Sequence, residues 1–290
     1  MKTVALAMVM GASALVQIGA AASQSASRFP MWDAKEPVAE YAQRAKLAST
    51  LTLNLGDGVT WEGVLVPAGT FVMGSPPGEA RTEQESLLET RHKVTISRPF
   101  YMGKYELTQA QFEGVMGVNP SLTKGSNLPV HNVSWQDAQT YCERLGTKVG
   151  RQVQLPTEAQ WEYACRAGTT TAYYSGNQIS DLDKVGWHAG NSERRPHPVG
   201  QLMPNRFGLY DMHGNIREFV RDYFDGKPLA DAIDPTGPAD GDPNNHVVRG
   251  GAYSANAAVA GNCRAAIRRP TEVLTITGFR IMVPLTEETR

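Results

Sequence analysis

The sequence predicts a loop-rich domain in which short strands combine with short helices. The chain carries 28 glycines and 18 prolines among 290 residues, together about 16% of the chain, against about 12% in average proteins. Strand-like spacing of apolar residues extends over only a few residues at a time, and the expected helices end soon after they begin. This composition argues against a helical bundle or a coiled coil.

The charge balance argues against nucleic acid and anionic membranes as partners. Lys plus Arg number 28 and Asp plus Glu number 29, which gives a net charge of −1. Proteins that bind such polyanions usually carry a strong basic excess or a basic patch. We find no internal repeat and no linker that divides residues 60–287, so we expect one domain there, preceded by an N-terminal arm over residues 23–59.

The first 22 residues have the pattern of a secretory signal peptide. Lys2 supplies a positive charge, an apolar run follows from Val4 to Leu15, and Ala20–Ala22 offers a cleavage site before Ser23. The run is too short to span a membrane, and no other stretch reaches about 18 apolar residues. No cysteine follows the run, which argues against a lipoprotein anchor. We expect a periplasmic or secreted chain with no membrane span.

The three cysteines are Cys142, Cys165 and Cys263. An odd number in an oxidising compartment allows at most one internal disulfide and leaves one thiol. None of the cysteines forms a C-x-x-C pair, and the six histidines form no H-x-x-x-H pair. A structural zinc site and a thioredoxin-type redox motif therefore have no support in the sequence.

The expected elements follow in chain order. The arm contains one short amphipathic helix around Pro37–Leu47. Residues 64–74 predict two short strands around a turn, and residues 94–102 continue in strand spacing. The intervening residues 76–91 are rich in Glu and Arg, and we expect them to form a solvated loop.

Three helix starts share one chemical signature, a hydroxyl three residues before an acceptor side chain. Thr108 and Thr157 are each followed three residues later by Gln, which predicts capping boxes, and Ser134 with Asp137 is a weaker version. The expected helices cover residues 112–116, 138–145 and 161–165, and Gly146 and Gly168 are the expected stops of the last two. The large aromatic residues in these segments are expected in the core: Trp135, Trp161 and Tyr163.

Four ordered segments carry a family resemblance. They are LPTEAQWEYACR (155–166), PNRFGLYDMHGN (204–215), VRGGAY (248–253) and GFR (278–280). Their order and spacing closely resemble the formylglycine-generating enzyme family, also called sulfatase-modifying factors, over about residues 60–287. The resemblance implies an α+β fold, a loop-rich single domain similar to the C-type lectin fold.

The same resemblance implies a catalytic site that this chain has lost. Family enzymes oxidise a sulfatase cysteine to formylglycine with O₂ and a copper ion held by two thiolates, ligands that suit Cu(I). The two family cysteines lie four and nine residues beyond the second Gly of the third motif. Counted from Gly251, these positions are Ala255 and Ala260, and the motif's serine is Ala252. We therefore expect no copper and no copper-dependent formylglycine formation.

The resemblance further implies a structural calcium site, built from the Asp211 and Glu218 carboxylates and the Gly214 and Ile216 carbonyls. Oxygen ligands of these kinds suit a hard cation. The alternative is that backbone N–H groups hold both carboxylates.

A disulfide is also implied by the resemblance, since some family members form one at the position of Cys165, with Cys263 as the available partner. The usual partner position of Cys142 is occupied by Ile281. Cys142 is therefore expected to be a buried free thiol.

Three functions remain open at this point, and whether the chain is an enzyme stays undecided. The first is an altered oxidase or maturation factor, similar to the family members that mature the pyoverdine siderophore. Its candidate residues are Arg249, Tyr253, Arg264 and Arg268, although the arginines could equally make structural hydrogen bonds. The second is a non-catalytic, C-type-lectin-like binding or regulatory module of the cell envelope, and the third is a sulfatase activator. The partner is expected to be a small molecule, a peptide or an envelope protein.

Overall fold

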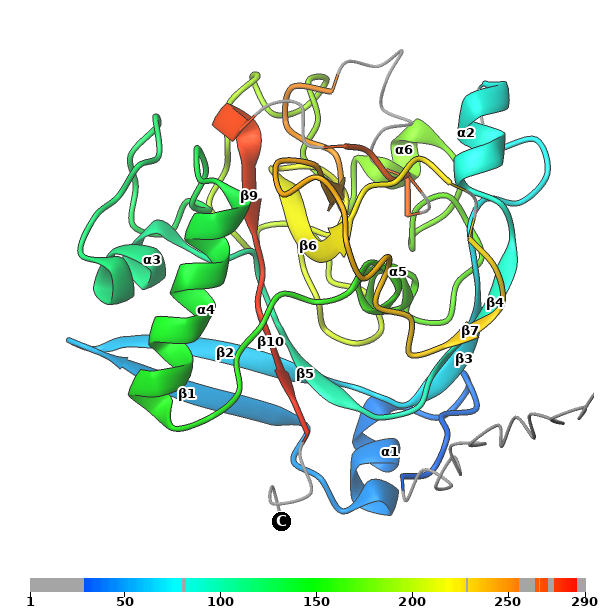
Figure 1. Ribbon diagram of the computed structural model, residues 1–290, viewed down its shortest axis with the longest axis horizontal. Coiled ribbons are helices and arrows are strands. Elements are labelled where there is room, and N and C mark those ends of the chain that lie inside the picture. The colour runs from blue at the N-terminus through cyan, green and yellow to red at the C-terminus, as the bar shows by residue number, and fades with distance from the viewer. Residues whose placement is uncertain are drawn as a thin grey trace, which may run out of the picture.

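The computed structural model describes residues 29–79, 82–227, 229–255, 264–265, 267–270 and 274–285. The predicted signal peptide, Ala260 and Cys263 lie outside these ranges. Short strands and short helices alternate with long loops throughout (Figure 1). No helix in the described ranges is long and apolar enough to cross a membrane.

The largest sheet has four strands in the order β1-β2-β5-β10, and each pair is antiparallel. Its strands are β1 (Thr50–Gly56), β2 (Val59–Val66), β5 (Phe100–Gly103) and β10 (Met282–Pro284). The sheet therefore joins the first strands of the domain to its last strand. The sequence reading missed β1, although its leucines at positions 51, 53 and 55 alternate with polar residues and Leu53 and Leu55 are buried.

Two three-stranded sheets complete the β structure. One has the order β3-β4-β7, from β3 (Gly69–Met73), β4 (His92–Ile96) and β7 (Ala232–Ile233). The other has the order β8-β6-β9, from β6 (Arg217–Tyr223), β8 (His246–Arg249) and β9 (Thr277–Phe279). In the latter sheet, β6 lies between β8, which contains the start of the third motif, and β9, which contains the start of the fourth, so motifs distant in sequence meet there.

The helices are short, and several carry the predicted caps. They are α1 (Val38–Ala45), α2 (Glu83–Leu88), α3 (Gln109–Met116), α4 (Trp135–Val149), α5 (Glu158–Arg166), α6 (Ile179–Leu182) and the 3₁₀ helix η2 (Leu274–Ile276). Complete capping boxes begin α3, α4 and α5 at Thr108, Ser134 and Thr157. These predictions are confirmed, including the Ser134 cap that looked weaker in the sequence.

Two sequence expectations about helices were wrong. The residues expected to form a charged loop contain α2, because Thr82 caps the helix by accepting a hydrogen bond from the Glu85 N–H. Helix α4 does not stop at Gly146 but continues to Val149, and Gly150 then ends it in the left-handed conformation with φ 63°. Gly146 has a packing reason instead, since a Cβ there would lie 3.0 Å from the Arg151 carbonyl oxygen.

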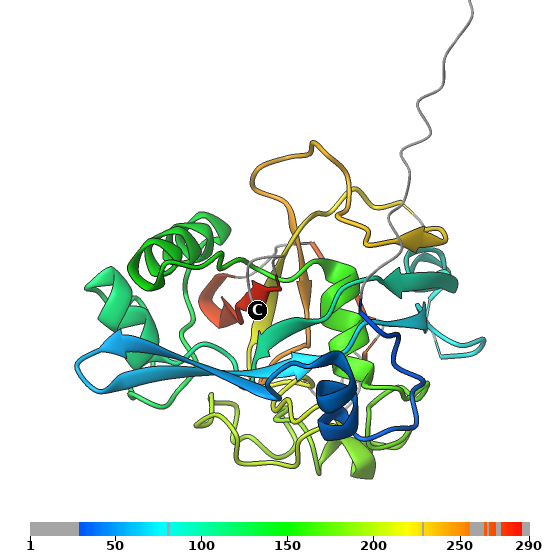
Figure 2. The ribbon, with the colours of Figure 1, turned by 90° about the horizontal axis from the view of Figure 1, so that it is seen from below.

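Helix α5 lies at the centre of the molecule and positions the rest of the domain around it (Figures 1 and 2). It packs against β3, β6 and β8, while α3 and α4 cover the β1–β2 hairpin at one side. Trp161 and Tyr163 on α5 are buried, and Trp135 packs partly buried against the same core. The observed architecture confirms the predicted single-domain α+β fold.

Candidate functional site

The first family cysteine position lies in a small apolar cluster next to the C-terminal end of α5. Ala255 is buried and packs with the side chains of Ala172, Tyr173, Leu182 and Val185. Its carbonyl oxygen accepts a hydrogen bond of 2.9 Å from the Ala189 N–H. The methyl group of Ala255 offers no ligand to a metal ion. Ala260, the second position, lies outside the described residues.

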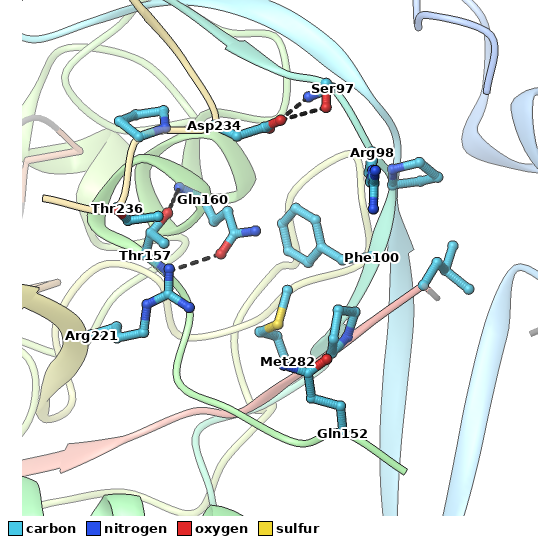
Figure 3. A pocket seen from close by; sticks show the side chains of 14 residues that line it. Ser97, Arg98, Phe100, Gln152, Thr157, Gln160, Arg221, Asp234, Thr236 and Met282 are labelled. Atoms are coloured by element: carbon cyan, nitrogen blue, oxygen red, sulfur yellow. Dashed lines mark hydrogen bonds between the residues drawn. The ribbon is translucent and has the colours of Figure 1, made fainter. Parts of the chain in front are cut away.

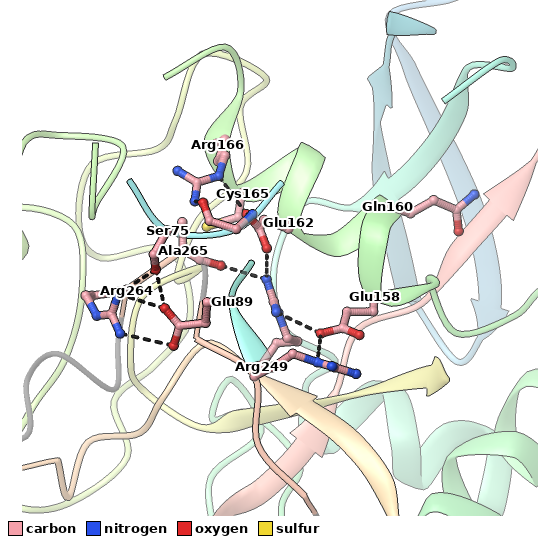
Figure 4. A network of polar contacts seen from close by, with 12 residues as sticks. Ser75, Glu89, Glu158, Gln160, Glu162, Cys165, Arg166, Arg249, Arg264 and Ala265 are labelled. Atoms are coloured by element: carbon pink, nitrogen blue, oxygen red, sulfur yellow. Dashed lines mark hydrogen bonds and ion pairs between the residues drawn. The ribbon is translucent and has the colours of Figure 1, made fainter. Parts of the chain in front are cut away.

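Arg249, a candidate catalytic residue, lies at the end of β8 and points into the protein interior (Figure 4). Its guanidinium donates hydrogen bonds to Glu158 at 3.0 Å and to Glu162, both on α5, and to the Ala265 carbonyl at 2.7 Å. It also stacks over the Trp161 ring, with 5.2 Å between the guanidinium carbon and the ring centroid. Arg249 therefore ties the third motif to the first.

The two glutamates of α5 bind further basic groups. Glu162 accepts hydrogen bonds from Arg166 Nε at 2.8 Å and from the Gly74 N–H at 2.9 Å. Burial alone would raise the pKa of Glu162, but the adjacent Arg166 and Arg249 guanidinium groups lower it below its ordinary value. Glu158 accepts a second charged hydrogen bond, of 2.8 Å, from Arg268 Nε. Glu162 is thus held as a buried carboxylate.

Arg264 is also buried, and it meets the acidic residues that surround α2 (Figure 4). Its guanidinium pairs with Glu79 at 2.8 Å, Glu89 at 3.0 Å and Glu85 at 3.3 Å. Arg269 adds a 2.8 Å pair to Glu85. The acidic segment expected to be solvated therefore binds arginines that lie about 180 residues later in the chain. The only sign of this contact in the sequence is a cluster of glutamates, which does not identify the partner.

The candidate arginines thus have structural partners, which was the alternative left open by the sequence.

Tyr253, the remaining candidate, has a side chain without such a partner within the described ranges. It is half-buried, burial raises the pKa of its phenol, and its hydroxyl has no hydrogen-bond partner among the described residues. Its backbone is fixed, because the N–H donates to the Asn215 carbonyl at 2.7 Å and the carbonyl accepts from Ser192 Oγ at 2.8 Å.

The predicted calcium ligands lie in a buried, carboxylate-rich cluster. Asp211 Oδ2 accepts a hydrogen bond of 2.7 Å from the Gly200 N–H, whereas Asp211 Oδ1 is buried without a hydrogen-bond partner in the described part of the chain. Burial raises the pKa of Asp211 to about 6. An orphaned carboxylate oxygen of this kind fits a cation ligand.

Glu218 fits the predicted calcium site less well. Arg280 of the fourth motif binds both of its oxygens at 2.7 Å, and Trp161 Nε1 donates to Oε2, also at 2.7 Å. No group of three or more His, Cys, Asp or Glu side chains that could hold a metal occurs among the residues described. Calcium at Asp211, Gly214, Ile216 and Glu218 stays a prediction.

Glu106 belongs to the same cluster and was missed by the sequence reading. It accepts hydrogen bonds from the Ile216 N–H at 3.0 Å and from Asn215 Nδ2 at 2.6 Å. Burial, followed by the charges of Asp211 and Glu218, raises the pKa of Glu106 well above its ordinary value. Three buried carboxyl groups thus surround a single guanidinium, that of Arg280. No motif signals this role, because Glu106 meets the second motif only in the folded chain.

Cys142 and Cys165 are buried and form no disulfide among the described residues, and burial raises the pKa of each thiol above its ordinary value. The free state of Cys142 was predicted. Cys165 Sγ lies 3.7 Å from His213 Nε2 and 3.9 Å from the Met212 carbonyl oxygen. Because Cys263 lies outside the described residues, the Cys165–Cys263 disulfide stays a prediction.

A central capped α5, the sheets beside it, and ion pairs that join the first motif to the third and the fourth motif to Glu218 characterise this domain. Residues 59–284 match the family model described as the sulfatase-modifying factor enzyme 1-like domain. The chain belongs to this family.

The similar proteins include formylglycine-generating enzymes and a relative that is named a chaperone protein. The formylglycine-generating enzyme of Mus musculus is 27% identical, with 75% of this chain and 73% of the relative covered. The chaperone protein LppX of Paenibacillus barcinonensis is 32% identical over 206 residues, which are 54% of this chain and 69% of the relative. Among solved structures, PvdO from Pseudomonas aeruginosa has a TM-score of 0.69 and 25% identity, and covers 81% of this chain and 98% of its own.

Proposed function

We propose that this protein is a periplasmic or secreted family member that acts by binding a partner and does not generate formylglycine with copper. One observation carries the proposal. The arginines that could orient a substrate, Arg249, Arg264 and Arg268, are buried in ion pairs with glutamates. Charged groups used in this way stabilise the scaffold and are not exposed to a substrate. The alanines at positions 255 and 260 support the same proposal, since neither provides sulfur.

The relatives support a binding role in a general way. LppX is named a chaperone protein, and a chaperone acts on another polypeptide through contact. A C-type-lectin-like domain suits such a role, because loops on a rigid scaffold provide the contact surface. The partner class follows from the predicted export, which places the contact outside the cytoplasm. An envelope or secreted polypeptide is the partner we propose.

An altered oxidase is the second candidate, and the likeness to PvdO favours it. For this function Tyr253 is the candidate catalytic residue. Its hydroxyl has no hydrogen-bond partner among the described residues, and hydrogen bonds hold both its backbone N–H and its carbonyl. The oxidation would resemble the one in pyoverdine maturation. Its electron acceptor would be O₂, so that O₂ uptake with the substrate tests it below.

The decisive experiment compares this protein with a family enzyme that retains both cysteines. The mature chain, starting at Ser23, is incubated with Cu(I), O₂, a thiol reductant and a cysteine-containing sulfatase peptide, and aldehyde is measured by mass spectrometry. We expect aldehyde only from the control enzyme. Aldehyde formed by this chain at a comparable rate would contradict the proposal and indicate a sulfatase activator. Oxygen uptake with immature pyoverdine would instead support the altered oxidase.

Binding is tested in cells by photo-crosslinking. A photoreactive phenylalanine replaces Tyr253 in the exported protein, and a matched probe replaces Arg144, which is exposed on α4. We expect one defined polypeptide adduct at position 253 and none at position 144. The same adducts at both positions, or none at either, would contradict a binding role for this face. N-terminal sequencing of the exported chain tests the predicted cleavage before Ser23.

A further inference from the structure

A cavity of about 430 Å³ lies at the N-terminal end of α5 and has no part in the function proposed above (Figure 3). The lining comes from the turn before β5 and the start of that strand, Gln152, the start of α5, Arg221 of β6, residues 234–236 after β7, and β10 with Leu285. Ala255 packs in a separate cluster, none of whose members lines this cavity.

Two arginines supply positive charge to this cavity. Arg98 is exposed in the turn between β4 and β5, and Arg221 is half-buried on β6. Neither guanidinium has a hydrogen bond or an ion pair within the part of the chain that the structure describes. Arg249, Arg264 and Arg268 differ in this respect, because each forms at least one ion pair with a glutamate. The charge of Arg221 partly offsets the rise in the pKa of the neighbouring Asp222.

The acidic group of the cavity is already engaged. Asp234 accepts hydrogen bonds from the N–H of Ser97, at 2.8 Å, and from its hydroxyl group, so that this carboxylate fixes the loop after β7 to the turn before β5. Asp234 keeps its negative charge, so the described lining carries the two positive charges of Arg98 and Arg221 against one carboxylate. Figure 3 shows the engaged pair on one side of the cavity and Arg221 on another.

The start of α5 does not supply the anion site, because its own side chains satisfy its N–H groups. Thr157 Oγ1 accepts from the Gln160 N–H at 3.2 Å, and Gln160 Oε1 accepts from the Thr157 N–H at 2.9 Å. Asp222 accepts from the Glu158 N–H at 2.8 Å. The capping box leaves Gln160 Nε2 as an additional uncharged donor in the lining.

The remaining wall is apolar. Phe100 and Met282 from paired strands, together with Leu285, form part of the lining, and two prolines adjoin them at positions 99 and 284. A ligand here meets hydrocarbon as well as polar and cationic groups (Figure 3). A pocket of this volume is large enough for a small molecule.

We propose that this cavity binds a small organic anion, in which a carboxylate or sulfate group pairs with the half-buried Arg221, Arg98 adds positive charge from another side of the cavity, and an apolar body lies against Phe100, Met282 and Leu285. A planar guanidinium forms two parallel hydrogen bonds with either oxyanion, which is why an arginine without an ion pair points to this chemistry. The apolar wall requires more than an inorganic ion. The free anion and an anionic side group of a larger partner would present the same chemistry.

Isothermal titration of the full mature chain with 2-naphthoate tests the proposal. We expect binding with a Kd below about 1 mM. Arg221→Gln should raise that Kd about tenfold, since a charged hydrogen bond is lost at a half-buried site. Arg98→Gln should raise it about threefold at an exposed site. Arg221→Lys keeps the charge without the planar fork and should be intermediate. Arg144→Gln, on the distant α4, is the matched control and should leave the Kd unchanged.

Three further probes separate the components of the ligand. 2-Naphthalenesulfonate should also bind, and the tighter of the two aromatic anions identifies the head group as carboxylate or sulfate-like. Neutral 2-naphthamide and inorganic sulfate should each bind at least about tenfold more weakly than 2-naphthoate. The inference is wrong if 2-naphthoate does not bind, if the amide binds equally well, or if both Gln variants bind like the wild type while melting at the same temperature. None of these results depends on the outcome of the aldehyde or crosslinking experiments.

Discussion

Arg249→Met removes the centre of the ion-pair network while keeping a long apolar side chain in its place. The arginine is fully buried and donates to Glu158, Glu162 and the Ala265 carbonyl. Because both glutamates are buried as well, solvent does not screen the lost charge. The substitution leaves two acidic side chains with one fewer cation and one carbonyl without its donor.

The expected loss in the free energy of unfolding is about 3 kcal/mol, the lower end of the range for breaking a buried ion pair. The lower end applies because Glu162 keeps Arg166 and Glu158 keeps Arg268. Urea denaturation of the mature protein at neutral pH measures it, with an unchanged m-value as the sign that only stability has changed. Exposed Arg144→Gln should change stability by less than about 0.5 kcal/mol.

A double-mutant cycle makes this prediction specific to charge. Adding Glu162→Gln to Arg249→Met removes one of the uncompensated charges, so the double variant should lose less stability than the sum of the two single variants. The Arg249→Met deficit should also shrink in acid. The pKa of Glu162 is lowered by folding, so its contribution is present above its ordinary pKa of 4.5 and is lost as pH falls through the folded value. A loss under about 1 kcal/mol, or strict additivity, would refute the reasoning.

Three further predictions concern buried groups elsewhere. Burial and then Glu158 raise the pKa of Asp222 to about 7, so its neutral form favours folding and its contribution is lost as pH rises through 7. At pH 8 the Asp222→Asn variant should therefore have a higher urea midpoint of unfolding than the wild type, and near pH 4 this difference should disappear. An equal difference in midpoint at both pH values would contradict the prediction. Calcium should be found by elemental mass spectrometry near one per chain and should raise the melting temperature, and Asp211→Asn should abolish both effects; a variant that retains calcium would exclude the site. After denaturation without reductant, maleimide should label only Cys142, and labelling of Cys165 before reduction would exclude its disulfide with Cys263.

Local signals in the sequence predicted the local structure well. A hydroxyl three residues before an acceptor is sufficient to begin a helix, and the boxes at Thr108, Ser134 and Thr157 formed as expected. The ends of the helices were harder to predict. Gly146 lies inside α4 because the backbone of Arg151 comes close to it, and the linear sequence does not reveal this contact. Strand β1 was missed for a different reason. Its alternation is regular, but its partner strand β2 had to be known before a short polar segment could be assigned to a sheet.

The candidate site was harder to predict, because its contacts are long-range. Arg264 pairs with Glu85 across 179 residues and with Glu79 across 185. Nothing in the spacing of a glutamate-rich segment distinguishes solvent from a distant arginine as its partner. Arg98 and Arg221 illustrate the converse. Neither belongs to a motif, and only the folded chain places both on one cavity, where neither forms an ion pair among the described residues.

The motifs that identified the family are the ones that hold the fold together. Glu158 and Glu162 of the first motif bind Arg249 of the third, and Arg280 of the fourth binds Glu218 beside the second. A chain can therefore keep all four motifs, and with them the scaffold, whatever residues occupy the positions that the sequence resemblance assigns to the family's cysteines, here Ala255 and Ala260. Family membership in this case establishes the architecture, while activity depends on residues outside the motifs. The search for function thus belongs at the face around Tyr253 and at the Arg98–Arg221 cavity, where polar groups are not committed to the scaffold.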